Sequence, residues 1–205
     1  MFRDVTDKYL AKPEASEILT FFNLSDGGNW NGAIFRFSDL SDVSYNKSLE
    51  VRIDPANPWF SNEIERQKQI ESFDNAASTI LNDAEKDSIG RNNSSIYLPI
   101  AGELNRLSQS KAQKRILIIY SDLMDNDLDV SLYSKNEFRE LEQNPQSLRS
   151  VFEARQQLGD LTGIEVHFIY QPADVLQDKE YRIVSAFYQK LLEDKGASVT
   201  IEANL

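Results

Sequence analysis

The stretch Lys114–Asp129, "KRILIIYSDLMDNDLD", decides how the chain folds. Its apolar and aromatic run, Ile116 to Tyr120, is typical of a strand that is buried on both faces of a parallel sheet. Four aspartates follow within eight positions: Asp122, Asp125, Asp127 and Asp129. Open sheets of this kind bind ligands outside the carboxyl ends of their strands, so these aspartates lie where a binding site is expected.

Strand and helix patterns alternate along the rest of the chain. We expect strands at residues 33–40, 44–53, 115–120, 163–172 and 198–205, and helices at residues 13–23, 60–84, 96–109, 144–159 and 178–197. The first two strands predict a hairpin. With a short strand at the start, the pattern predicts an α/β, Rossmann-like fold: a doubly wound, mainly parallel six-stranded sheet with one antiparallel edge strand and helices on both faces. No repeat or linker interrupts it, so we expect one domain over residues 1–205.

Composition narrows the classes of partner. The net charge is −11 and the pI about 4.6, so the surface repels nucleic acid and anionic lipid, and we expect neither as a partner. No apolar run approaches the length of a membrane span, and we expect a soluble chain. The polar start "MFRDVTDKYL" is no secretory signal. The compartment stays open, with the cytoplasm favoured unless an upstream leader is missing.

Cysteine and histidine usage excludes several kinds of site. There is no cysteine, which excludes disulfides and thiolate ligands. The single histidine, His167, excludes most catalytic zinc sites, which need more than one. It lies in the strand pattern "GIEVHFIY", and we interpret it as a structural residue.

Three segments are expected to meet at the carboxyl edge of the sheet: "RDVTDK" (3–8), "GRNNSSIYLP" (90–99) and "IIYSDLMDND" (118–127). Their order, with the hairpin between the first and the long helix, resembles the von Willebrand factor A domain. In that family the first strand ends in Asp-x-Ser-x-Ser, a later loop supplies a Thr, and the fourth strand ends in an Asp within Thr-Asp-Gly. Together these residues bind a divalent cation such as magnesium and leave one position for a carboxylate of the partner.

The resemblance implies a ligand set for this chain. Asp4 and Thr6 match the first two motif positions, Ser94 or Ser95 stands where the Thr does, and Asp122 matches the Asp at the strand end. Two residues depart from the family pattern: Lys8 replaces a hydroxyl, and Leu123 replaces the Gly. A cation at Lys8 would oppose a bound metal or substitute for it electrostatically. Only three residues precede Asp4, so the first strand is either unusually short or begins upstream of Met1.

Three functions follow as hypotheses. The leading one is a non-enzymatic protein–protein interaction domain of von Willebrand A type. If a divalent cation such as Mg²⁺ binds at the degenerate site, the partner protein donates a carboxylate to its open position. The alternative is a metal-dependent phosphoesterase that uses Asp4 and Asp122 with Asp125 or Asp127, since paired carboxylates hold Mg²⁺ and activate water. A third is a scaffold that has lost the site.

The candidate residues also have structural interpretations. Asp, Thr and Ser are common at helix N-termini, so Asp4, Thr6, Ser94 and Ser95 are equally suited to cap helices. The calcium-loop spacing fails after Asp125, because Val130 and Asn136 stand where Gly and Glu are required. We therefore interpret Asp125, Asp127 and Asp129 as a solvated acidic loop.

Large aromatic residues stand in the loops. They are Trp30, Trp59 and Phe60. We expect them to pack under the sheet edge, with the anchoring of a partner as the alternative.

Overall fold

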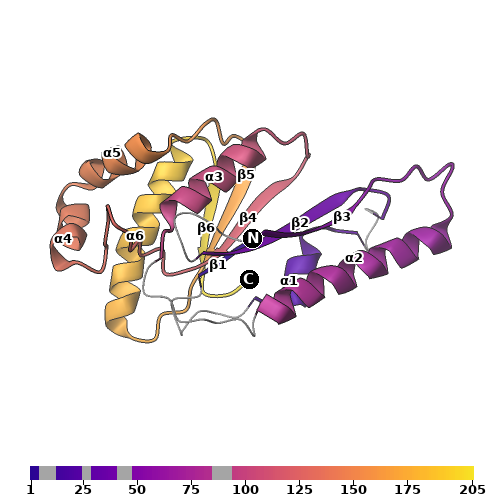
Figure 1. The fold of residues 1–205 in the computed structure, drawn as a ribbon, viewed down its shortest axis with the longest axis horizontal. Helices are drawn as coiled ribbons and strands as arrows, with labels where there is room; N and C mark the ends of the chain where they lie inside the picture. Colours follow the sequence, from indigo (N-terminus) through magenta and orange to yellow (C-terminus); the bar gives the residue numbers. More distant parts are fainter. Residues whose placement is uncertain (5–12, 25–28, 41–47, 85–93) are drawn as a thin grey trace.

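The computed structural model describes residues 1–4, 13–24, 29–40, 48–84 and 94–205. Along the chain the elements are β1 (Phe2–Asp4), α1 (Ala15–Thr20), β2 (Ala33–Leu40), β3 (Ser48–Ile53), α2 (Glu63–Ala84), α3 (Tyr97–Ser108), β4 (Arg115–Tyr120), α4 (Lys135–Gln143), α5 (Pro145–Arg155), β5 (Ile164–Ile169), α6 (Val175–Glu193) and β6 (Ser198–Glu202). Figure 1 shows α2 and the β2–β3 pair extending away from α3, α4, α5 and α6, with α1 beside α2.

The strands form one six-stranded sheet in the order β3-β2-β1-β4-β5-β6. The β2–β3 hairpin is antiparallel and the other neighbours are parallel, which confirms the predicted fold class. The chain builds outward from β1 in one direction and from β4 in the other. The order of the strands therefore reverses between β1 and β4, and a crevice at their carboxyl ends is where such a sheet binds ligands.

Helices cover both faces of the sheet, as predicted. In β4 the buried side chains of Leu117 and Ile119 belong to a core layer with α3, α5 and α6. Those of Ile118 and Tyr120 belong to a second layer with α1 and α2. Since successive residues of a strand point to opposite faces, the unbroken apolar run supplies both layers at once. Among the described residues, no helix is both long and apolar enough to cross a membrane.

One helix was not predicted, and others have different limits. Helix α4 has Leu141 as its one buried residue, so its nine positions carry too few apolar residues for a recognisable periodicity. Helix α1 is shorter than expected. Helix α6 begins three residues early, at Val175, because the side chain of Asp174 caps it by accepting from the amide of Gln177.

Arg66 joins the start of α2 to the ends of the hairpin. Its side chain is 2% exposed and donates to the carbonyl oxygens of Asn29, Asn31 and Asp54. It also donates to the side chain of Gln69. Three loop carbonyls thus depend on one guanidinium, whose fork of donors no other side chain reproduces.

Replacing Arg66 by Met should destabilise the protein by about 2–3 kcal/mol, because the loop carbonyls lose their donor while the apolar stem is kept. Urea denaturation measures this. The control is Lys68→Met on the exposed side of the same helix, which should change the free energy of unfolding by less than about 0.5 kcal/mol. Equal midpoints for the two variants would contradict this role for Arg66.

Candidate functional site

The side chains of Asp4, Ser94 and Ser121 meet at the carboxyl ends of β1 and β4, and Asp122 follows Ser121 directly. We name these four residues the Asp4 cluster. Asp4 is 1% exposed, and its Oδ2 accepts from Ser94 Oγ at 3.3 Å and from Ser121 Oγ at 3.0 Å. The partners lie 90 and 117 residues away along the chain. The parallel register aligns Arg3 with Tyr120, so Asp4 and Ser121 occupy the next aligned positions. The segments expected to converge therefore do so.

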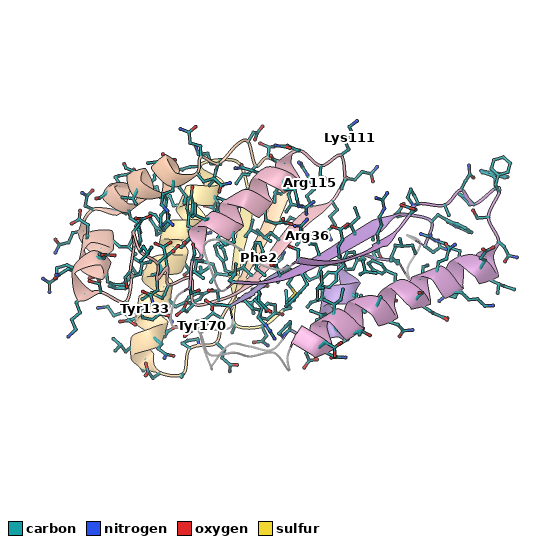
Figure 2. The ribbon with its side chains drawn as sticks, in the orientation of Figure 1. Phe2, Arg36, Lys111, Arg115, Tyr133 and Tyr170 are labelled. Carbon is teal, nitrogen blue, oxygen red and sulfur yellow. The ribbon has the colours of Figure 1, made fainter. Side chains whose placement is uncertain are left out.

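Asp122 is fixed at the rim of the cluster. Its Oδ1 accepts from the amide of Met124 at 2.9 Å, and its Oδ2 accepts from the hydroxyl of Tyr133 at 2.8 Å. In the view of Figure 2, Tyr133 and Tyr170 are labelled on the side of the molecule opposite to Arg115, which lies at the start of β4. The carboxylate is 7% exposed. Its neighbours thus hold it in one orientation.

The turn after β4 has an unusual backbone at Leu123. Its φ is 62°, in the left-handed region that favours glycine, although its side chain is fully buried in the core. The amide of Leu123 donates to Ser121 Oγ at 2.9 Å. Burial of the leucine side chain offsets the strain of this conformation.

The acidic loop that follows is not solvated as predicted, except at Asp129, whose side chain is 68% exposed. Asp125 is 0% exposed, and its Oδ2 accepts from the amide of Tyr97 at 2.7 Å and from the hydroxyl of Tyr188 at 3.2 Å. The side chain of Asp127 is 2% exposed and bonds Arg155 Nη2 at 2.6 Å. The interpretation as a solvated loop is therefore wrong for Asp125 and Asp127.

These buried carboxylates position the loop before α3. Two backbone hydrogen bonds, at 3.0 and 2.7 Å, join Ser94 to Asn126. The hydroxyl of Ser95 donates to Asp127 at 3.2 Å, so of the two serines only Ser94 donates to Asp4. Neither serine caps α3, because Asp125 accepts from the first amide of that helix. The acidic loop is a scaffold that holds Ser94 against Asp4.

The two buried aspartates differ in protonation. Burial raises the pKa of Asp125 to about 7, although the hydrogen bond from the Tyr97 amide opposes this, and the charge of Asp127 adds to it. Burial would also raise the pKa of Asp127, but hydrogen bonds from Arg155 and from the amides of Asp129 and Val130 outweigh it and lower that pKa. At neutral pH the carboxyl group of Asp125 is therefore near the midpoint of its titration, whereas that of Asp127 is ionised.

The donor atoms of the Asp4 cluster fit a hard divalent cation. All are oxygens, which Mg²⁺ and Ca²⁺ prefer. A serine hydroxyl that donates its proton to Asp4 can still offer a lone pair to a metal. Ser121 Oγ has one left, because the other accepts from the amide of Leu123. Among the residues described, no group of three or more histidine, cysteine, aspartate or glutamate side chains is placed to hold a metal, so a site here depends on hydroxyl ligands. Thr6 lies outside the described residues.

Ser121 is the member of the cluster that the sequence reasoning missed. It precedes Asp122 directly, where the family named above has the Thr of Thr-Asp-Gly. A hydroxyl at that position was the signal that would have identified it.

The remaining candidates lie outside the cluster. His167 lies in β5, with Nδ1 3.2 Å from Oε2 of Glu202 and its ring against Phe21. Trp59 and Phe60 are 88% and 89% exposed, so the prediction that they pack under the sheet edge is wrong. Trp30 is half-buried.

Comparisons with protein-family models, curated proteins and solved structures gave no match to this chain.

Proposed function

We propose that this chain is a non-enzymatic protein–protein interaction domain of von Willebrand A type. In this proposal a divalent cation, Mg²⁺, is held by Asp4, Ser94, Ser121 and Asp122, together with Thr6. The bound ion would supply an open coordination position for a carboxylate of the partner protein. The observation that carries the proposal is the pair of serine hydroxyls that donate to one buried carboxylate at the point where the strand order reverses.

The backbone at Leu123 supports the same proposal. The family has glycine at this position, and Leu123 adopts a left-handed conformation, which glycine adopts most readily. A leucine in this conformation is what would be expected if it had replaced a glycine in a turn of the same kind. Ser121 likewise retains the hydroxyl of the family's Thr-Asp-Gly.

Isothermal titration calorimetry with Mg²⁺ or Mn²⁺ tests the site. Asp122→Asn keeps acceptor and donor atoms for Met124 and Tyr133 but removes the charge, and it should weaken binding by at least about tenfold. The matched control is Asp129→Asn, which removes the same charge from an exposed side chain of the same loop and should bind as the wild type does.

Two outcomes would contradict the proposal. If the wild type takes up neither ion, the metal site is absent; if Asp122→Asn and Asp129→Asn bind equally, the ion lies elsewhere. Hydrolysis of a phosphoester by the Mn²⁺-loaded protein, abolished in Asp4→Asn, would favour the phosphoesterase hypothesis instead.

A further inference from the structure

The loop between β3 and α2, together with the first turn of α2, presents three large apolar side chains to solvent. We name Trp59, Phe60 and Ile64 the aromatic tip; they are 88%, 89% and 70% exposed. The turn is well fixed, since Asn57 accepts from the amides of Trp59 and Phe60. Exposed aromatics on a preorganised turn lose little conformational entropy on binding, which is typical of interface anchors.

A groove of about 530 Å³ lies between the α4–α5 corner and α6. This volume is in the range of pockets that take ligands of about drug size, and two aromatic side chains are of that order. Apolar residues from all three helices line it: Leu141, Pro145, Ile183, Ala186, Phe187 and Leu191. On α6 the spacing of Ile183, Ala186 and Phe187 leaves an apolar stripe facing the groove.

The tip is acidic, and cations line the groove. The first turn of α2 carries Glu63 and Glu65 beside the tip, with Lys68 one turn further on. The groove is lined by the cations Arg149, Arg182 and Lys190 and by one acid, Glu142. Arg149 pairs with Glu153 and Asp194, and Arg182, whose side chain is 76% exposed, pairs with Asp178. Lys190 makes no ion pair with a described residue, so it is the cation most available to the glutamates of the tip.

The tip and the groove lie at opposite ends of the molecule. Figure 1 shows the start of α2 at one end and α4, α5 and α6 at the other. One copy therefore cannot fill its own groove. Two tips facing each other would bring four glutamates together, so like-charge repulsion disfavours that arrangement.

We propose that the protein associates head to tail, with the aromatic tip of one copy in the α4–α6 groove of the next. This goes beyond the proposed function and does not depend on a metal. Such a contact is heterologous and leaves a free tip and a free groove at the ends, so it builds open chains. A tip of three side chains buries less than the roughly 1,200–2,000 Å² of a stable interface, so the association should be weak.

Sedimentation velocity of the full chain from about 10 μM to about 1 mM tests this, because a contact of this size should have a micromolar to millimolar dissociation constant. The wild type should sediment faster as its concentration rises, and less so at high salt. A tip variant, Trp59→Ser/Phe60→Ser, and a groove variant, Ala186→Glu, should each associate at least about tenfold more weakly. Ile34→Ser, at an exposed residue outside both surfaces, is the control.

Mixing gives the decisive result. The tip variant keeps its groove and the groove variant keeps its tip, so the mixture should form a dimer that grows no further. A wild type that stays monomeric throughout overturns the proposal. So does a mixture that stays monomeric, or a groove variant that self-associates as the wild type does.

Discussion

Replacing Asp127 by Ala is expected to lower the free energy of unfolding by about 3 kcal/mol. The carboxylate bonds Arg155, whose side chain is 14% exposed, and without it a largely buried guanidinium keeps only the exposed and more distant carboxylate of Asp129, 3.7 Å away. The same carboxylate accepts from the amides of Asp129 and Val130 and from the hydroxyl of Ser95. Urea denaturation at neutral pH measures the loss.

Two further variants distinguish the loss of the buried Asp127–Arg155 pair from the general effect of removing one negative charge from the loop. Asp129→Ala removes an exposed carboxylate 3.7 Å from the same arginine and should cost less than about 1 kcal/mol. Arg155→Met should recover part of the stability in the Asp127→Asn background, because no charge is then left buried.

Since the pKa of Asp127 is lowered, its contribution to stability is present above about pH 4 and is lost as the pH falls. Equal losses for Asp127→Ala and Asp129→Ala would refute the buried pair.

The sheet could be predicted from the sequence because each strand is marked by a short apolar run within its own residues. In β4 the apolar run fills both core layers, and the position of Asp122 after it follows from chain order alone. The meeting of Asp4 with the strand end could also be anticipated, because parallel strands share one carboxyl edge. What this reasoning could not decide was which of the two adjacent serines donates to Asp4, since that depends on the pairing of Ser94 with Asn126.

The burial of Asp125 could not be predicted, because its partners are remote. Tyr97 and Tyr188 lie 28 and 63 residues away, and no spacing within the loop points to either. A run of aspartates is most often a solvated surface, so composition favours that interpretation. The exposure of Trp59 and Phe60 could not be predicted either, because large aromatic side chains are usually at least partly buried, and nothing in their local sequence indicates that these two are exposed.

Asp125→Asn is expected to change how stability depends on pH. Below about pH 4 the carboxyl group is protonated in both the folded and the unfolded chain, so it adds no pH dependence. Between about pH 4 and pH 7 the unfolded chain ionises Asp125 while the fold retains the proton, because burial raises the folded pKa to about 7. Each unit of pH in this window therefore removes about 1.4 kcal/mol from the stability of the wild type.

Asparagine keeps an acceptor for the Tyr97 amide and has no charge to bury, so the variant lacks this loss. The stability of Asp125→Asn relative to the wild type should rise by on the order of 4 kcal/mol between pH 4 and pH 8 and then level off. Urea titrations at several pH values measure the difference directly. Asp129→Asn should give a curve parallel to the wild type, since that side chain is exposed. A constant difference between Asp125→Asn and the wild type across this range would show that the buried carboxyl group keeps an ordinary pKa, and that its hydrogen bonds from Tyr97 and Tyr188 outweigh its burial.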